Sequence, residues 1–399
     1  MNLKKWLSVV AIVVLSLALV VGVACGGGED EDGVKEVKFG IGAPLSGIMG
    51  AILGVPIQQG FDLANDYIGE FTVAGESYKW KIILENNSWS SQGGVASTTK
   101  LIFEDGVKFV TQIGGDPAMA AQTLCEESDV ILFASGIPVE AFGPDKPHTF
   151  HPAPAAAPTA AALFKYVSEA HPEVKTAAAA LDDSTTSRMF VSTASAAAEY
   201  FGIEWLSADY FPSGTTELFP LATKMVDKDP DICVIWLSLV PIMRSMGWEG
   251  ISTHPDWATA YGEGQGWDNV EGHLHYYTAP FGDGLPEAVY EIAADYEQQY
   301  GTEFPQMAFL CVLQLYYMTD ALMKAGTVND MDQIIATLET ENLDTPMGPV
   351  RFGLEGIDGI GHQLMMPYRV GEIRGGEYYR VFEISIDEGE ALVNEIWGQ

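Results

Sequence analysis

The stretch VKFGIGAPLSG, residues 37–47, decides the fold of this chain. Its first six residues form a short, mostly apolar run of the strand type, and Pro44 and Gly47 end that run in a loop. Further along, short apolar runs alternate with longer segments of helical periodicity, an order that favours a parallel sheet covered by helices. We therefore predict strands at 37–42, 79–84, 108–113 and 130–134, and helices at 56–68, 95–103 and 118–127.

The same pattern starts again after a proline-rich segment. Five prolines lie within residues 143–158, a composition that suits a chain crossing between two lobes. Because 399 residues are too many for one compact core, we predict two α/β lobes of similar plan. In the second lobe we expect helices at 159–170, 185–200 and 217–226, and strands at 176–181, 203–207 and 232–237.

The last part of the chain is helical before it returns to strands. A tail that rejoins a sheet after a helical block predicts a chain that crosses between the lobes more than once. The expected helices are 286–300, 305–325 and 331–340, and the expected strands are 366–370 and 378–384.

The N-terminus has the features of an export signal. Lys4 and Lys5 form a basic start, residues 6–24 are almost entirely apolar, and Cys25 is followed by GGGEDED. The pattern resembles a bacterial lipoprotein signal at residues 1–24, with Cys25 lipidated and residues 25–35 as an acidic, glycine-rich tether. This predicts a protein of the cell envelope or periplasm, anchored to a membrane. Gly22 stands where such signals usually carry leucine, so conventional cleavage is the alternative.

The composition suits a folded, acidic protein. Apolar residues make up 47% and charged residues 19%, which argues against disorder. A formal net charge of −35 would repel a phosphate backbone, so nucleic-acid binding is excluded. Cys125, Cys233 and Cys311 lie in apolar surroundings and are predicted to be buried thiols; one disulfide with a leftover thiol is the alternative. No second apolar stretch is long enough to predict a further membrane helix.

Motifs of the common enzyme classes do not occur. The sequence has no Walker loop, no HExxH and no GxSxG. The glycines at 40 and 42 lack the third glycine of a dinucleotide site, and Pro44 interrupts the helix start that such a site needs. His273 and His275 would face one side of a strand, but they lack a third zinc ligand. We therefore predict a protein that is not an enzyme and holds no cofactor or metal.

Five short segments, in order along the chain, carry a family resemblance. They are FGIGAPLSG at 39–47, GFDLA at 60–64, LIFEDGV at 101–107, DPD at 229–231 and PMGPVRF at 346–352. Together they resemble the type I periplasmic solute-binding proteins of the branched-chain amino-acid and amide class, the Leu/Ile/Val-binding-protein-like receptors of ABC transporters. The resemblance covers about residues 36–385.

The resemblance implies an α/β fold of two doubly wound, Rossmann-like lobes joined by three hinge crossovers. It implies a first lobe at residues 36–150 and 278–360, and a second at 151–277 and 361–399. An amino acid, an amide or an aromatic compound would bind between the lobes, beyond the strand C-termini, and the lobes would close on it. The implied partners are this small-molecule ligand and ABC permease subunits, and the implied state is a monomer.

Two other functions remain open. A ligand-sensing receptor of the same fold, coupled to a separate signalling partner, would share all of these features. An exported hydrolase would need a nucleophile with a neighbouring base, and the sequence shows no recognisable pair.

Loops that follow strands of the first lobe supply candidate ligand contacts. The plainer interpretations are turns at the serines and glycines, a packed indole at Trp89, and a helix start with Asp116 at the N-cap. An ionised Asp116 would repel a carboxylate, so its presence favours an amide, a polyol, a cation or a neutral aromatic ligand. The candidates are Ser46, Trp89, Gly115, Asp116, Ser135 and Gly136.

The second lobe supplies four more candidates. Thr186 and Ser238 follow strands, where helix capping or a simple turn is the alternative. The resemblance puts an acid that holds a ligand ammonium near Glu263, with Tyr261 beside it. Both lie in an expected loop at 257–267 that is framed by tryptophans and rich in glycine.

Overall fold

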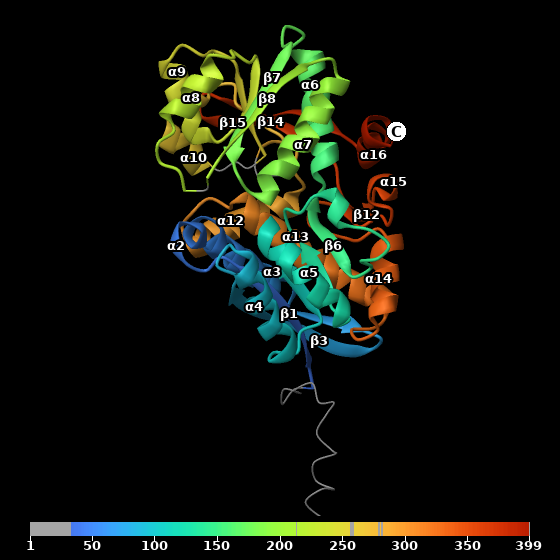
Figure 1. Ribbon diagram of the computed structural model, residues 1–399. Helices are drawn as coiled ribbons and strands as arrows, with labels where there is room; N and C mark the ends of the chain where they lie inside the picture. The colour runs from blue at the N-terminus through green and yellow to red at the C-terminus, as the bar shows by residue number, and fades with distance from the viewer. Residues whose placement is uncertain (1–32, 213, 256–258, 278–279, 281, 399) are drawn as a thin grey trace, which may run out of the picture.

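The computed structural model describes residues 33–398, apart from 213, 256–258, 278–279 and 281. The chain forms two α/β lobes, each built on one sheet (Figure 1). It passes between the sheets after β6, after β11 and after β13. The predicted fold class, two doubly wound lobes with three crossovers, is therefore confirmed. The predicted signal at 1–24 and Cys25 lie outside the described residues, and the exact lobe boundaries stay a prediction.

The first sheet has the strand order β12-β13-β6-β5-β4-β1-β3-β2. Its interior strands pair in parallel, and β2 and β12 run antiparallel at the two edges. The strands are β1 (Lys35–Ala43), β2 (Glu70–Val73), β3 (Glu76–Asn86), β4 (Phe109–Gln112), β5 (Ile131–Ala134), β6 (Thr149–Pro154), β12 (Arg351–Gly353) and β13 (Gln363–Met365).

The second sheet has the order β15-β14-β11-β10-β9-β7-β8. The strands from β8 to β11 pair in parallel, and the C-terminal hairpin joins them antiparallel. The strands are β7 (Thr176–Asp182), β8 (Glu204–Phe211), β9 (Ile232–Ile235), β10 (Ile251–His254), β11 (Leu274–His275), β14 (Tyr368–Arg374) and β15 (Glu377–Ile384).

Helices cover both faces of each sheet. Those of the first lobe are α2 (Gly47–Met49), the π-helix η1 (Gly50–Gly54), α3 (Val55–Ile68), α4 (Ser91–Phe103), α5 (Gly115–Glu127), η2 (Val139–Ala141), α12 (Glu287–Tyr300), α13 (Gln306–Ala325), α14 (Met331–Thr340) and α15 (Glu355–Asp358). Those of the second lobe are α6 (Ala156–Ala170), α7 (Thr185–Tyr200), α8 (Phe219–Val226), η3 (Leu237–Leu239), α9 (Val240–Ser245), α10 (Thr259–Gln265), α11 (Trp267–Val270) and α16 (Ile386–Trp397).

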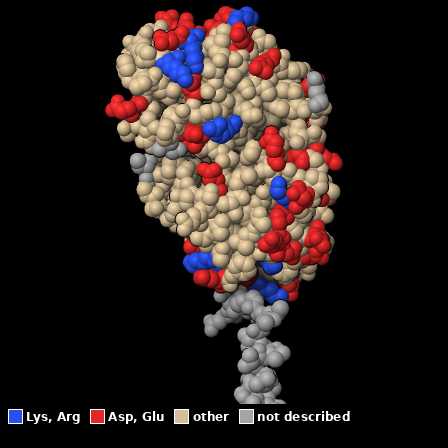
Figure 2. All heavy atoms as spheres, viewed as in Figure 1, with Lys and Arg blue, Asp and Glu red and all other residues tan. Residues whose placement is uncertain are grey.

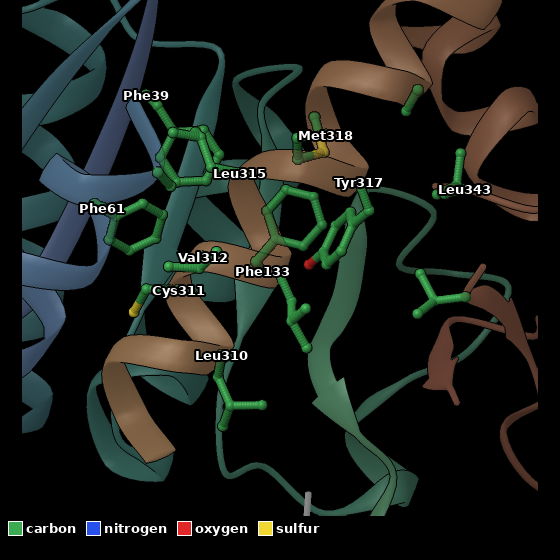
Figure 3. Packing of buried hydrophobic residues seen from close by; sticks show 14 of the residues in the cluster. Phe39, Phe61, Phe133, Leu310, Cys311, Val312, Leu315, Tyr317, Met318 and Leu343 are labelled. Atoms are coloured by element: carbon green, nitrogen blue, oxygen red, sulfur yellow. The ribbon is translucent and has the colours of Figure 1, made fainter. Parts of the chain in front are cut away.

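The core of the first lobe is aromatic, and α13 covers it. Most positions of this helix are buried, as its nearly continuous apolar sequence predicts. Phe39 of β1 stacks on Phe133 of β5 with ring centroids 6.3 Å apart, and Phe133 meets Tyr317 of α13 edge to face at 6.0 Å (Figure 3). The Phe133–Tyr317 contact helps to hold α13 against the sheet, although α13 lies far from β1 and β5 in sequence.

Replacing Trp80 of β3 by alanine should lower the free energy of unfolding by about 3–5 kcal/mol. Trp80 is 3% exposed, its Nε1 donates to Thr319 Oγ1 at 2.8 Å, and its ring meets Phe39 and Phe109 edge to face. The substitution would leave a cavity and remove that hydrogen bond. Phe103, which is 66% exposed, provides the control: Phe103→Ala should change the free energy by less than about 0.5 kcal/mol. Urea unfolding measures both variants, and similar losses would contradict this account of the core.

The proline-rich segment differs from its prediction. Residues 149–154, expected to cross between the lobes, form β6 within the first sheet. Proline lacks an N–H group, and β6 accommodates Pro154 because β5 pairs only with Thr149 and Phe150. Pro154 lies opposite β13, where the register shifts. The expected strand at 232–237 is also shorter, since η3 begins at Leu237.

The surface is strongly acidic. On the face in Figure 2, Asp and Glu side chains are spread over both lobes and gather at the lower right, while Lys and Arg are few. Within the described residues, no helix combines the length and apolar character that a membrane span requires.

Candidate ligand-binding site

Loops at the carboxyl ends of the parallel strands bring the two lobes into contact. After β4 the chain enters α5 of the first lobe, and after β7 it enters α7 of the second. The Gly115 N–H donates to Thr186 Oγ1 at 3.3 Å, and Thr186 Oγ1 donates to the Gly136 carbonyl oxygen at 3.1 Å. Thr185 Oγ1 donates to Asp116 Oδ1 at 2.6 Å. Four predicted site residues, Gly115, Asp116, Gly136 and Thr186, therefore meet in one place.

Glycine is required at this contact. Gly136 has φ +76, and a Cβ atom there would lie 2.4 Å from Thr186 Oγ1. At Gly115, a Cβ atom would lie 2.5 Å from the Gly136 carbonyl oxygen and 2.8 Å from Thr185 Cβ. All three distances are too short for a real Cβ atom, so the absence of side chains at these two positions allows the loops of the two lobes to touch.

The start of α5 differs from the predicted helix start. Gly114, with φ 99, is the N-cap residue, and Asp116 lies in the first turn. Asp116 is exposed and accepts its hydrogen bond from the other lobe, so it does not cap its own helix. The prediction of Asp116 as N-cap was wrong because only glycine readily adopts this positive φ.

Trp89 lies beside this contact. Its backbone has φ 51, and its N–H donates to Asn87 Oδ1 at 3.0 Å. Buried Asn87 in turn donates to the carbonyl oxygens of Gly42 and Ile113 at 3.0 and 2.8 Å, which ties together the ends of β1, β3 and β4. The half-buried indole covers Gly114, where an added Cβ would lie 2.8 Å from Trp89 Cζ3. Asn87 was missed, although a polar residue directly after a strand was a usable signal.

Ser46 and Ser135 stand on neighbouring strand-end loops. Ser46 is exposed at the start of α2, and its hydroxyl accepts a long hydrogen bond of 3.4 Å from Asn86 Nδ2. Ser135 is half-buried after β5, and its N–H donates to the Gln112 carbonyl oxygen at 3.0 Å. Both positions follow strands of the first sheet, as predicted.

The other second-lobe candidates, Ser238, Tyr261 and Glu263, lie in the short helices η3 and α10. Ser238 is exposed in η3, and Glu263 is exposed in α10, where a loop was expected at 257–267. The α10 backbone includes Tyr261, whose side chain lies outside the described part. Among the contacts of the described residues, none joins Ser238 or Glu263 to Thr186.

A polar group at the end of β7 was not predicted. Asp182 Oδ1 accepts from Ser187 Oγ at 2.5 Å and from Trp236 Nε1 at 3.3 Å. The Trp236 ring lies against His254 with centroids 4.9 Å apart. Asp182 and His254 end β7 and β10, and Trp236 directly follows β9 between them, so the three residues form one polar and aromatic edge of the second sheet. An acid directly after a buried alanine strand was the signal that could have identified this edge.

The crossover region is held by buried polar contacts. His275 Nε2 lies 3.0 Å from Gln306 Oε1, and the Tyr277 hydroxyl donates to the Pro154 carbonyl oxygen at 2.8 Å. Burial lowers the pKa of His275 to about 3, so this imidazole is neutral in the folded protein at neutral pH. His273 is buried as well, with Nδ1 3.0 Å from Ser252 Oγ. No group of three metal-ligating side chains occurs in the described part of the chain.

Among the hollows of the described surface, two lie along helices of the first lobe. One, of about 530 Å³, is lined by residues of α3 and α12, including Tyr67 and Asp295. The other, of about 370 Å³, also reaches Tyr67 and Tyr316. Neither hollow includes a residue of the strand-end loops. We assign the candidate site to those loops because side chains of both lobes meet there.

Comparison with known proteins gives a family and a fold. Residues 36–377 match the family model described as periplasmic binding protein. No curated protein matches the chain.

Solved structures of similar fold cover almost the whole chain. A solute-binding protein of an ABC transporter from Rhodopseudomonas palustris BisB5, in complex with 3,4-dihydroxybenzoic acid, is 18% identical and has a TM-score of 0.74, covering 88% of this chain and 98% of that one. The leucine-binding protein LivK from Thermotoga maritima MSB8 is 18% identical and has a TM-score of 0.74, covering 88% of this chain and 99% of that one. A periplasmic binding protein from Burkholderia mallei is 13% identical and has a TM-score of 0.76, covering 89% of this chain and 96% of that one.

Proposed function

The chain belongs to the periplasmic-binding-protein family, and from that premise we propose that it binds a small organic solute between its lobes and delivers it to an ABC importer. Members of this family are extracytoplasmic binding proteins of ABC transporters and not enzymes. The solute we propose is an amino acid, an amide or an aromatic compound. The first and second lobes would follow the boundaries given above and close about their three crossovers.

One observation carries the proposal. Loops at the strand C-termini of both lobes converge where Thr186 bonds to Gly115 and Gly136. Open parallel sheets bind ligands beyond their strand C-termini, and hinge closure brings two such edges together. The ligand would contact this group together with Trp89, Ser46 and Ser135, and with Ser238, Tyr261 and Glu263 of the second lobe.

A thermal-shift screen tests the proposal. The compounds include leucine, benzoate and 3,4-dihydroxybenzoate, which are named for proteins of this fold, with amides, amines and polyols. A ligand at 100 times its dissociation constant stabilises the folded protein by about 2.7 kcal/mol, which raises Tm by several degrees. No rise with any compound at millimolar concentration would contradict solute binding.

Replacing Cys25 by serine should release the protein from the membrane into the soluble envelope fraction. The proposal is that lipid on Cys25 anchors the receptor near its permease, through the tether at 25–35. Immunoblots of membrane and soluble fractions measure the release, and Cys125→Ser is the control because Cys125 is a buried free thiol. Mass spectrometry of the retained protein separates the outcomes: a Cys25→Ser protein that lacks residues 1–24 and still stays in the membrane fraction would contradict lipid anchoring, whereas one that keeps them is held by the uncleaved apolar segment.

A further inference from the structure

The N-terminus of α5 would ordinarily be an anion site. The first residues of a helix carry N–H groups without partners inside the helix, and these groups attract carboxylates and phosphates. In α5 the first internal bond is from the Ala118 N–H to the Gly114 carbonyl oxygen at 3.0 Å. The N–H positions open to an anion are therefore those of residues 114–117.

Three features of this chain leave an anionic ligand few of these N–H groups. Pro117 has no N–H group. The Gly115 N–H already donates to Thr186 Oγ1 of the other lobe at 3.3 Å. The Trp89 indole packs against Gly114, where a Cβ atom would lie 2.8 Å from its ring, and so narrows the approach to this turn.

Two hydrogen bonds hold the Thr186 hydroxyl at the N-terminus of α5. Its oxygen accepts from the Gly115 N–H, and its hydrogen goes to the Gly136 carbonyl oxygen at 3.1 Å. The Thr186 side chain thus pairs both the N–H donor of Gly115, which follows β4, and the carbonyl acceptor of Gly136, which follows β5. A ligand carboxylate that took the Gly115 N–H would have to displace Thr186 and leave the Gly136 carbonyl facing another oxygen atom.

Asp116 adds a negative charge to the same turn. It is exposed, and its Oδ1 accepts a hydrogen bond from Thr185 Oγ1 at 2.6 Å. The negative side chain already complements the positive end of the helix dipole, and it repels a second carboxylate. It also offers acceptor lone pairs to any N–H group that approaches from between the lobes.

From these contacts we infer that the ligand carries a nitrogen donor group, an amide or an amine, in place of a carboxylate at this position. The inference rests on the proposed function and narrows its ligand class. The N–H groups of such a ligand donate to Asp116, while Thr186 keeps its bonds to Gly115 and Gly136. Asp116 and Thr186 are the residues that set this specificity.

Calorimetric titration of matched compounds tests the inference. Benzoate, benzamide and benzylamine form one series; 4-methylpentanoate, 4-methylpentanamide and 4-methylpentylamine form another. In at least one series the amide or the amine should bind at least tenfold more tightly than the acid. An acid that binds as tightly as its amide and amine, or more tightly, overturns the inference and leaves the proposed function standing.

A double variant tests the two residues directly. Asp116→Ser with Thr186→Ala removes the charge and frees the Gly115 N–H, so benzoate or 4-methylpentanoate, acids without an amine, should bind at least tenfold more tightly than it binds to the natural protein. Asp116→Asn with Thr186→Ser is the control, because it keeps the hydroxyl on Gly115, and it should gain less. Equal gains in affinity in the two variants, or no gain in the first, count against the assignment of Asp116 and Thr186.

If these compounds fail to bind but the screen yields another ligand, the acid, amide and amine forms of that ligand are compared in the same way. If nothing binds, the proposed function and the inference fail together.

Discussion

Replacing Gly136 by alanine should weaken ligand binding at least tenfold while both lobes stay folded. The added Cβ would lie 2.4 Å from Thr186 Oγ1 and 3.2 Å from its Cγ2 atom, and all three nearest atoms belong to Thr186 of the other lobe. The clash therefore acts between the lobes, not within the first one. A tenfold loss corresponds to about 1.4 kcal/mol, which a contact this short readily exceeds. The positive φ of Gly136 adds local strain of about 1–2 kcal/mol.

Removing the opposing side chain separates these two effects. In the Gly136→Ala background, Thr186→Gly takes away the atoms that clash, so the lobes should close again and part of the affinity should return. Local strain at position 136 would not be relieved by that second change. Small-angle scattering measures closure, and calorimetry measures affinity. If Gly136→Ala binds and closes like the natural protein, the two lobes do not meet at Thr186 when ligand is bound.

Lowering the pH from 7 to 5 should reduce the free energy of unfolding by about 4 kcal/mol through two buried histidines. Burial lowers the pKa of His151 to about 4 and that of His275 to about 3. In the unfolded chain, these two histidines take up protons near pH 6.5. In the folded protein, the same two side chains stay neutral until the pH falls to about 4 or below. Between these values the unfolded state binds more protons, so stability falls as pH falls, by about 1.4 kcal/mol per pH unit for each group.

Other histidines adjust the size of this effect. His273, fully buried, has its pKa lowered by burial and adds to the loss. His148 acts in the opposite direction, because its hydrogen bond to Glu126 raises its pKa. The stability that His148 contributes is present below pH 6.5 and is lost as pH rises through its folded-state value.

Urea unfolding at pH 7 and pH 5 measures the loss, and His275→Gln supplies the control. That variant removes one of the titrating groups, so its loss between the two pH values should be about 2 kcal/mol smaller. A loss of the same size in both proteins would show that His275 is not neutral and buried in the folded state.

The regular elements could be predicted from local patterns in the sequence. The expected strand at 37–42 lies within β1, and the expected helix at 305–325 is α13, because apolar runs and helical periodicity are local signals. β6 was missed because its prolines favoured a connection. α10 was missed because the glycines and aromatics of residues 259–265 are typical of a loop.

The candidate site depends on contacts that one sequence cannot reveal. The Asp116–Thr185 bond joins residues 69 positions apart, and the Thr186–Gly136 bond spans 50. The resemblance pointed to the loops after β4 and β5 but could not show that threonines of α7 bond to them. Asp182, Trp236 and His254 are adjacent only because β7, β9 and β10 pair in register.

Native mass spectrometry of the protein purified from its own cell envelope tests solute binding most directly. We expect one non-covalently bound small molecule per chain, released chemically unchanged when the protein is denatured. Fragmentation of that molecule should show an amide or amine group. A protein that carries no bound molecule and takes none up from the screening compounds, or that returns an altered molecule, would contradict the account of a solute receptor.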